Sequence, residues 1–288
     1  MQTGRLVLYG GRAKRARTEK LMEIAVLGPL TVKAGSGEVI PTAAKPRKLL
    51  AMLAIHADDV VPIVELNEEL WGNDIPRSAS TTLQTYILNL RTLIASAMGS
   101  SSAQAKQILS TRPGGYALNT TSVDVRDFER LTEAGHRAHQ AREYELAADH
   151  FRQALALWRG PALVDVQLGP LLEGEVQRLT EARLCALDRR IDADLRLGRH
   201  HELIGELTGL VAKHRTHEGL HAHLMVALYR SGRRAQAMTV YRKMRTSLID
   251  ELGLEPSPSL RRLQQAILKS DVALGESRLE RVGVSLPG

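Results

Sequence analysis

Stretches rich in strand-forming residues open the chain and are separated by turn residues. Residues 23–33 form one such stretch, interrupted by Gly28-Pro29, and residues 38–41 form a second. Gly35-Ser-Gly37 lies between them and is typical of a turn. The pattern predicts a small antiparallel sheet at this end of the chain.

After Lys45 the apolar residues recur at helical spacing. We expect a first helix from about Lys45 to just before Asp58-Asp59, a second over about 63–71 and a third from about Ser78 to Ala97. A loop over Gly72–Pro76 separates the second from the third. The third helix has a stripe of apolar residues with the spacing of a buried face: Leu83, Ile87, Leu90 and Ile94.

A strand, a turn and a second strand follow the third helix. The Ser-rich residues 99–105 are expected to be flexible. Residues 108–111 and 116–118 predict two strands joined by a turn at Arg112-Pro-Gly-Gly115. Strands, three helices and a hairpin in this order are typical of a winged helix-turn-helix, with the hairpin as the wing. The third helix is then the candidate reader of the major groove of DNA.

From Val123 onward the sequence predicts almost only helix. Ala147-x3-Phe151-x2-Ala154 and Ala237-x3-Tyr241-x2-Met244 share the spacing of a TPR second helix. Gly198-Arg199 and Gly232-Arg233 are 34 residues apart, which is the TPR period. The expected fold is therefore mostly α with a small β component: an N-terminal winged helix-turn-helix, followed by an all-α TPR-like helical repeat domain.

These patterns divide the chain into four segments. Residues 1–21 are a basic arm or extension, 22–120 the winged-helix domain, 121–272 the helical domain and 273–288 a flexible tail. The arm has two interpretations. It either follows DNA phosphates, or it is an extension without a role that precedes a start at Met22.

The net charge indicates nucleic-acid binding only in part. The chain carries a formal charge of +7, but residues 1–21 hold six basic and one acidic side chain, whereas residues 22–120 hold eight of each. DNA binding by the folded part therefore requires its basic groups to gather on one face. With Cys185 as the only cysteine, no disulfide framework exists, and a cytoplasmic location is expected. No apolar run reaches the roughly 18 residues that a membrane span needs.

Four stretches together resemble the Streptomyces antibiotic regulatory protein (SARP) family, which joins an OmpR/PhoB-like winged helix to a bacterial transcriptional activation domain. The order and spacing of the stretches, from about Glu23 to Lys269, make the resemblance specific. They are Leu27-Gly-Pro-Leu30, Lys45-Pro-Arg-Lys-Leu-Leu-Ala-Met-Leu-Ala54, Leu70-Trp-Gly72 with Leu83-Gln-Thr-Tyr-Ile-Leu-Asn-Leu-Arg91, and Tyr229-Arg-Ser-Gly-Arg233 through Glu251-Leu-Gly-Leu-Glu-Pro256.

The resemblance implies a transcription activator of a secondary-metabolite (antibiotic) gene cluster. Such proteins bind direct repeats in promoter DNA, usually as dimers, and recruit RNA polymerase holoenzyme. In related winged helices the loop between the second and third helices faces the polymerase, so Asp74 is the candidate contact and Trp71 is expected in the core. No phosphate-binding ATPase motif is present and no receiver domain is expected, as in the small stand-alone form of the family.

The candidate DNA-reading residues follow from helical geometry. With the apolar stripe inward, Thr81, Thr85, Leu88, Asn89 and Thr92 lie on the opposite face of the third helix. Hydroxyl and amide groups both donate and accept hydrogen bonds, which suits base edges, although a merely solvated polar face has the same pattern.

The resemblance adds roles to individual residues of this helix. It places Asn89 where an arginine commonly contacts bases, and Thr82 and Arg91 where phosphate contacts are expected. Asparagine favours adenine over guanine, so the usual site sequence of the family is in doubt.

Further cations lie outside the third helix. Lys45, Arg47 and Lys48 open the first helix, where cations oppose the helix dipole, so a DNA phosphate is a reason for them and a solvated basic turn is the alternative. Arg112 in the wing is positioned for a phosphate or the minor groove.

Other classes of function have less support. No nucleophile, phosphate loop or carboxylate pair indicates an enzyme, and no cofactor is expected. His217, His221 and His223 have metal-compatible spacing without a completing ligand. A TPR-like interaction scaffold and a DNA-binding repressor remain alternatives. Clustering of Lys45, Arg47, Lys48, Arg91 and Arg112 around the third helix and wing favours DNA, and scattering favours the scaffold.

Overall fold

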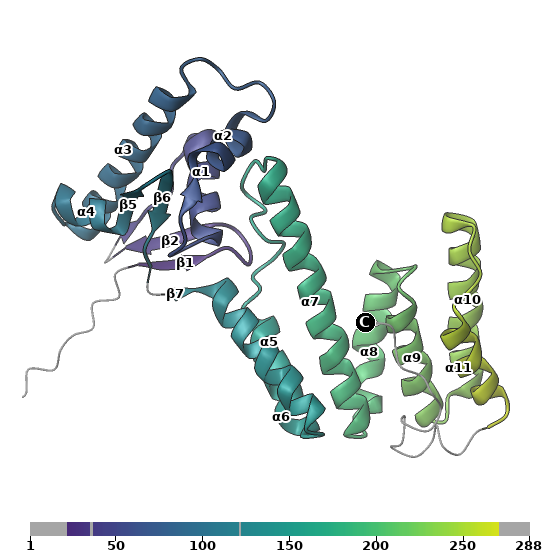
Figure 1. Ribbon diagram of the computed structural model, residues 1–288. Coiled ribbons are helices and arrows are strands. Elements are labelled where there is room, and N and C mark those ends of the chain that lie inside the picture. Colours follow the sequence, from purple (N-terminus) through teal and green to yellow (C-terminus); the bar gives the residue numbers. More distant parts are fainter. Residues whose placement is uncertain (1–21, 35–36, 121, 271–288) are drawn as a thin grey trace, which may run out of the picture.

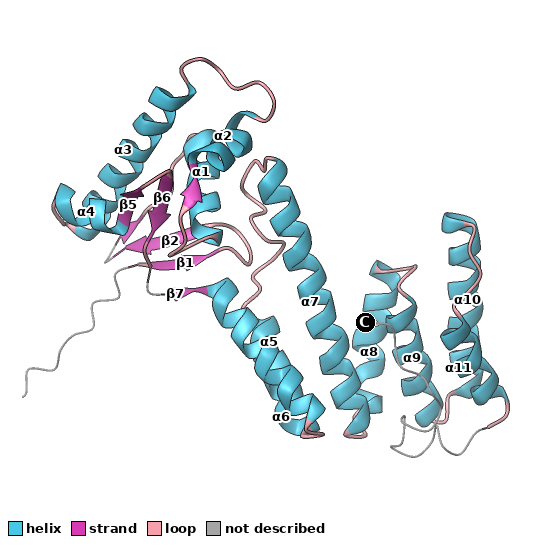
Figure 2. Ribbon diagram, in the orientation of Figure 1, coloured by secondary structure: helices cyan, strands magenta, loops and turns pink. Residues whose placement is uncertain are grey.

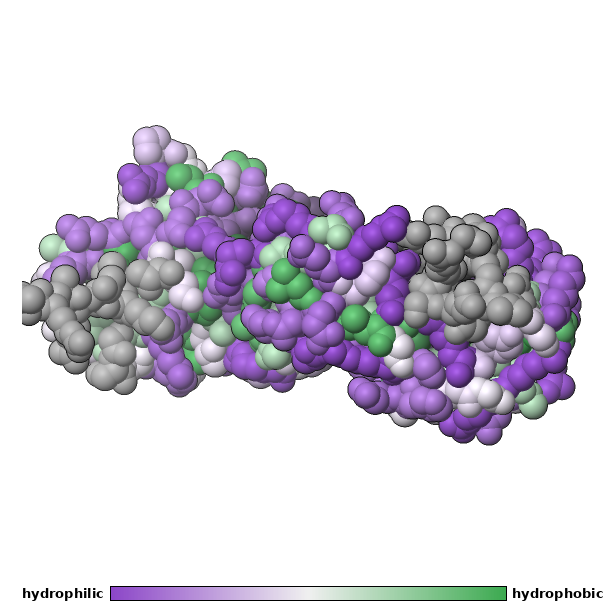
Figure 3. All heavy atoms as spheres, turned by 90° about the horizontal axis from the view of Figure 1, so that it is seen from below, coloured by the Kyte–Doolittle hydropathy of each residue, from purple (hydrophilic) through white to green (hydrophobic). Residues whose placement is uncertain are grey.

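The computed structural model describes residues 22–34, 37–120 and 122–270 (Figure 1). The predicted basic arm and the whole of the predicted tail lie outside the described residues. The described chain forms an elongated molecule, and the face seen from below is mostly polar with apolar residues between the polar ones (Figure 3). Within these ranges, no helix combines the length and apolar character that crossing a bilayer requires.

A four-stranded sheet begins the fold. Its strands are β1 (Glu23–Ala25), β2 (Thr31–Ala34), β3 (Gly37–Glu38) and β7 (Ser122–Val123), in the order β3-β2-β1-β7. β1 pairs with β2 in antiparallel fashion, and β2 with β3. These pairings confirm the predicted antiparallel sheet. β7, which follows the wing, adds a parallel edge beside β1.

Three helices and a second sheet complete the winged helix. The helices are α1 (Ala44–Ile55), α2 (Ile63–Trp71) and α3 (Ala79–Met98), and the second sheet contains β4 (Val61–Pro62), β5 (Leu109–Arg112) and β6 (Gly115–Leu118) in the order β4-β6-β5. β5 and β6 form the predicted wing, with Gly114 in the left-handed region at φ 79°. Figure 2 shows the hairpin beside α3.

The segment between α3 and the wing differs from the sequence-based expectation. Instead of a flexible Ser-rich stretch, it contains a short helix, α4 (Ser102–Ile108). A capping box begins this helix: the Ser101 hydroxyl accepts from the Gln104 N–H, and the Gln104 side chain accepts from the Ser101 N–H. Ala105 and Ile108 anchor the helix in the core. The serine is therefore a helix cap rather than a sign of disorder.

The C-terminal half is helical, as predicted. Its helices are α5 (Asp124–Gln140), α6 (Tyr144–Ala156), α7 (Pro170–Arg196), α8 (His200–Lys213), α9 (Glu218–Arg230), α10 (Arg234–Leu252) and α11 (Pro258–Leu268). Gly198 and Gly232 have φ values of 80° and 73° at the α7–α8 and α9–α10 turns. The two glycines therefore occupy equivalent turns of successive helix pairs, which accounts for their TPR-like spacing.

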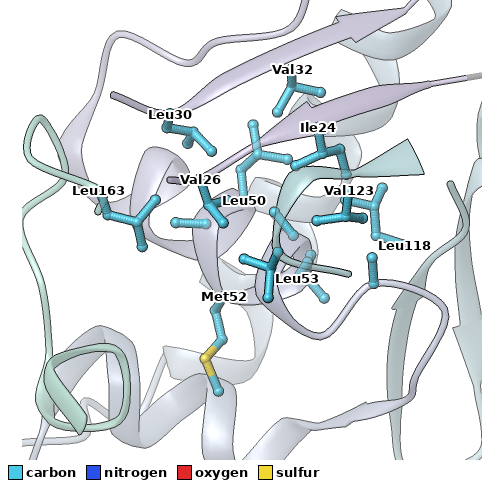
Figure 4. Packing of buried hydrophobic residues seen from close by; sticks show 14 of the residues in the cluster. Ile24, Val26, Leu30, Val32, Leu50, Met52, Leu53, Leu118, Val123 and Leu163 are labelled. Carbon is cyan, nitrogen blue, oxygen red and sulfur yellow. The ribbon is translucent and has the colours of Figure 1, made fainter. Parts of the chain in front are cut away.

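The hydrophobic cores divide inside α7 rather than at residue 120. The first core combines the winged helix with α5, α6 and most of α7, and the second extends from Ile191 to α11. Figure 4 shows Leu163, from the loop before α7, lying near the side chains of the N-terminal sheet and α1. The winged helix and the first helices of the C-terminal half therefore share one core.

Buried carboxylates also join the two halves. The Glu69 carboxylate of α2 accepts hydrogen bonds from the backbone N–H groups of Gly169, Leu171 and Leu172 at 2.6, 2.9 and 3.0 Å, and so caps the N-terminus of α7. Asp124 of α5 likewise accepts from the N–H groups after β1. Burial raises the pKa of Asp124, and these hydrogen bonds oppose the increase. These contacts join α2 to the start of α7, and α5 to the chain after β1.

Candidate nucleic-acid interface

The exposed face of α3 has the composition that its helical spacing predicts. Ala79, Leu83, Ile87, Leu90 and Ile94 are buried against the winged-helix core. The opposite face is solvent-exposed at four predicted polar positions and at Leu88, which is 60% exposed. The four are Thr81, Thr85, Asn89 and Thr92. Thr82 is half-buried at the side of the helix.

Hydrogen bonds within α3 orient the hydroxyl groups of two of these threonines. The Thr85 hydroxyl donates to the Thr81 carbonyl at 2.9 Å, and the Thr92 hydroxyl donates to the Leu88 carbonyl at 3.0 Å. With their protons engaged, the two oxygens are acceptors toward a ligand. In the major groove, such acceptors match the amino groups of adenine and cytosine.

Arg91 joins α3 to the wing. Its Nε donates to the Leu109 carbonyl at 2.9 Å, and one terminal nitrogen donates to the Thr111 hydroxyl at 2.8 Å. Burial lowers the pKa of Arg91. The phosphate contact that the family resemblance implies for Arg91 stays a prediction. In the structure, two of its five N–H donors hold the hairpin beside the helix.

Two further arginines flank α3 at the surface. Arg112 is exposed at the end of β5, as expected for a wing residue. Arg77 is exposed two residues before α3 begins, and the sequence analysis did not single it out. In the sequence, the position of Arg77 just before the third helix was the feature that could have identified it. Between Ala79 and Met98, Arg91 is the only charged residue, so no carboxylate on α3 repels phosphate.

The three cations of α1 do not join the α3 surface. Lys45 Nζ lies over the Trp71 ring, 5.1 Å from its centroid. Arg47 forms an ion pair with Asp165 in the loop before α7. Lys48 is buried and donates to the Glu69 carbonyl at 3.3 Å.

A phosphate contact of Arg47 or Lys48 stays a prediction, and both side chains have partners within the protein. Both side chains point into the junction between α1, α2 and the chain leading to α7, and their partners lie 118 and 21 residues away in sequence. Of the five basic residues expected to cluster, Arg91 and Arg112 lie at α3 and the wing, and the three from α1 do not. The electrostatic argument for DNA thus depends on fewer residues than predicted, with Arg77 in addition.

The loop between α2 and α3 is exposed. Asp74 is accessible there, and its N–H donates to the Trp71 carbonyl at 3.2 Å. The neighbouring Ile75 is 51% exposed. Trp71 is half-buried and packs against the first core, as expected. An acidic and an apolar side chain are thus exposed together in the loop that precedes α3.

The histidines of α9 make contacts within the protein. His217 Nδ1 accepts from the Leu220 N–H at 3.2 Å, and His223 Nε2 lies 2.9 Å from the Asp188 carboxylate. His221 Nδ1 lies 3.1 Å from the His217 carbonyl oxygen. Among the described residues, no group of three or more His, Cys, Asp or Glu is arranged to hold a metal ion.

Both halves of the chain match known protein families. Residues 37–118 match "Transcriptional regulatory protein, C terminal", and residues 123–268 match "Bacterial transcriptional activator domain". The first match contains α3 and the wing, and the second contains α5 to α11.

Similar proteins are themselves regulators. Regulatory protein DnrI of Streptomyces peucetius is 50% identical over 253 residues, which are 87% of this chain and 93% of DnrI. Regulatory protein AfsR of Streptomyces coelicolor is 38% identical over 88% of this chain, which spans only 25% of AfsR. The solved structure of Mycobacterium tuberculosis EmbR in complex with a low-affinity phosphopeptide has a TM-score of 0.81 and 33% identity, covering 88% of this chain and 66% of EmbR.

Proposed function

The chain belongs to the Streptomyces antibiotic regulatory protein family of DNA-binding transcription activators, and on this premise we propose that it activates a secondary-metabolite gene cluster. In this proposal it binds direct repeats in promoter DNA through α3 and recruits RNA polymerase holoenzyme. The observation that carries the proposal is the uncharged polar face of α3, held beside the wing by Arg91.

The exposed residues of α3 divide into base-reading and backbone-contacting groups. Asn89 pairs with an adenine edge through its amide, and Leu88 contacts a thymine methyl group. Thr81, Thr85 and Thr92 accept hydrogen bonds from base amino groups or meet the backbone. Thr82, Arg77, Arg112 and the remaining donors of Arg91 contact phosphates on either side. Arg47 and Lys48 are left out, because their partners lie within the protein.

The exposed α2–α3 loop is the proposed polymerase contact. Asp74 supplies a charge and Ile75 an apolar anchor, both exposed in this loop. Direct repeats place two copies in the same orientation along the duplex, so the proposed assembly on DNA is a homodimer. Each copy then presents its loop in the same direction.

A mobility-shift titration tests sequence reading by the winged helix. The protein, with and without residues 1–21, is titrated onto its own upstream promoter region and onto scrambled DNA. We expect the truncated form to prefer the promoter. Equal, salt-sensitive binding that disappears with residues 1–21 would contradict the assignment of α3 and favour the interaction scaffold.

A promoter–reporter assay separates activation from repression. We expect the reporter signal to increase when the protein is supplied, and Asp74→Ala to reduce that increase without changing the mobility shift. A signal that decreases on supplying the protein would identify a repressor instead.

A further inference from the structure

A groove lies between helices of the second core. These helices, α8, α9 and α10, are at the end of the molecule far from α3 (Figure 1). They enclose the groove in two adjoining parts with volumes of about 760 and 380 Å³. The parts share Thr208, Val211, His221 and Lys243, so they form one continuous depression. Ligand sites for small molecules typically measure about 300–1,000 Å³, which is the range of each part.

The floor of the groove is apolar. Leu224 and Leu228 of α9 are buried, and Val211 of α8 and Val240 of α10 are half-buried along its sides. Such a floor favours a ligand with a hydrocarbon or aromatic body, because the groove releases water from apolar surface when it is filled.

The rim of the groove is cationic. Arg242 and Lys243 of α10 are exposed beside the floor, and Arg215 lies at one end, 3.4 Å from Glu251. None of the described residues that line either part is an aspartate or glutamate. The lining itself therefore does not neutralise the positive charge at the rim. An anionic group on the ligand would complement this charge.

One buried polar side chain lies in the lining of both parts. The His221 ring is 6% exposed, and Nδ1 faces the His217 carbonyl oxygen at 3.1 Å, which assigns the ring proton to Nδ1. Burial lowers the pKa of His221, which favours the neutral ring. In the neutral ring with its proton on Nδ1, Nε2 is a hydrogen-bond acceptor.

We propose that this groove binds a small amphipathic organic anion. Its apolar body lies on Val211, Leu224 and Val240, its acidic group pairs with Lys243 and Arg242, and a hydroxyl or amine on the body donates to His221 Nε2. The site is separate from the proposed DNA surface and does not depend on it. An acidic peptide is the competing occupant, but the apolar floor formed by Val211, Leu224, Leu228 and Val240 offers no side-chain hydrogen bonds to a peptide backbone.

The probe for the test is 8-anilinonaphthalene-1-sulfonate, which joins an aromatic body, a secondary amine and a sulfonate. Fluorescence and calorimetric titration of the full chain should show one saturable site. Lys243→Glu should weaken binding at least tenfold by reversing the charge at the rim. Thr208→Trp should weaken it similarly by filling the part of the groove that both cavities share, with no change of charge.

Lys213→Glu is the matched control, because Lys213 is an exposed lysine of α8 outside the lining. It should bind the probe like the unaltered protein. Circular dichroism and melting temperature establish that all three variants fold.

Three results would overturn the proposal. One is probe binding that neither Lys243→Glu nor Thr208→Trp weakens, or that Lys213→Glu weakens equally. Another is displacement of the probe by inorganic sulfate at equal concentration, which would indicate a simple anion site. The third is displacement by an acidic peptide at a lower concentration than the probe itself, which would assign the groove to a protein partner.

Discussion

At the residue scale, the predicted DNA-reading positions of α3 present an amide, three hydroxyl-bearing side chains and one leucine, between flanking arginines. In the proposed function, these uncharged groups contact base edges and the arginines contact phosphates, so sequence specificity comes from the uncharged groups. The arginines contribute affinity that falls as salt screens the phosphates. Asn89 represents the uncharged groups and Arg112 represents the arginines. Substituting each residue in turn separates their contributions to specificity and affinity.

We expect Asn89→Ala to lower the preference for the promoter over scrambled DNA by about 1–3 kcal/mol, because one bidentate base contact is lost. Arg112→Ala should instead weaken both DNAs alike and reduce the slope of log affinity against log salt by about one unit. Mobility shifts over a salt series measure both quantities. Gln177→Ala, an exposed substitution on α7, is the control. Unchanged preference in Asn89→Ala would assign base reading to another residue.

The sequence was sufficient to place Asn89 on the exposed face, because helical geometry and four apolar residues determine that face. The sequence was not sufficient to predict that Lys48 is buried. The lysine belongs to the same basic run as Lys45, yet it is buried under Glu69, a partner that only the packing of α1 against α2 brings near. A run of like charges in a sequence therefore does not show which of its members reach solvent.

At the scale of elements, buried carboxylates determine how neighbouring helices meet. Glu69 of α2 caps α7, and Asp192 of α7 accepts from His139 of α5 and from Arg196 within α7. The helix order and the TPR-like turns were predictable from periodicity and glycine spacing. These contacts were not, because each joins residues that are distant in sequence. α4 was missed for a local reason, since its capping residue belongs to a run of serines.

We expect Glu69→Ala to reduce the free energy of unfolding by about 2–4 kcal/mol, since three N–H groups at the start of α7 lose their acceptor in a buried site. Glu68→Ala, at the exposed neighbouring position, should change it by no more than about 0.5 kcal/mol. Urea denaturation measures both. Equal effects of the two substitutions would show that the cap contributes little.

The stability contributed by Asp192 should depend on pH. Burial alone would raise the pKa of Asp192, but hydrogen bonding with His139 and the charge of Arg196 outweigh it and lower the pKa to about 2. A lowered pKa means that this stabilisation is fully present above the ordinary value of 3.8 and is lost as pH falls toward 2. The difference in unfolding free energy between the protein and Asp192→Asn, about 2 kcal/mol at neutral pH, should therefore shrink below pH 4. A constant difference across that range would contradict this account.

At the scale of the whole molecule, the division of the cores inside α7 makes the winged helix dependent on the helical half. Val125 and Phe128 of α5, Phe151 of α6 and Leu163 all belong to the same core as α1. The periodicity of the sequence places a domain boundary at residue 120, because the pattern changes there. The hydrophobic periodicity of a sequence does not show whether the packed core continues across such a boundary.

A truncation series tests this continuity. A fragment of residues 22–198 retains every residue of the first core, and we expect it to unfold cooperatively and to bind promoter DNA. A fragment of residues 22–120 exposes the apolar surface that α5, α6 and α7 cover, so it should lose cooperative thermal unfolding by circular dichroism. If the shorter fragment melted at the temperature of the longer one, the shared core would be irrelevant to the winged helix.

The contact between Glu69 and Gly169 constrains which segments related proteins can exchange by recombination. A side chain at residue 169 would place its Cβ 2.3 Å from the Glu69 carbonyl oxygen, so the glycine accommodates the approach of α2. Recombination that transplants only the DNA-reading half of a relative separates these two positions, although they lie 100 residues apart in one gene. A stable hybrid therefore needs Glu69 and Gly169 from the same parent, and a crossover beyond the start of α7 meets this requirement.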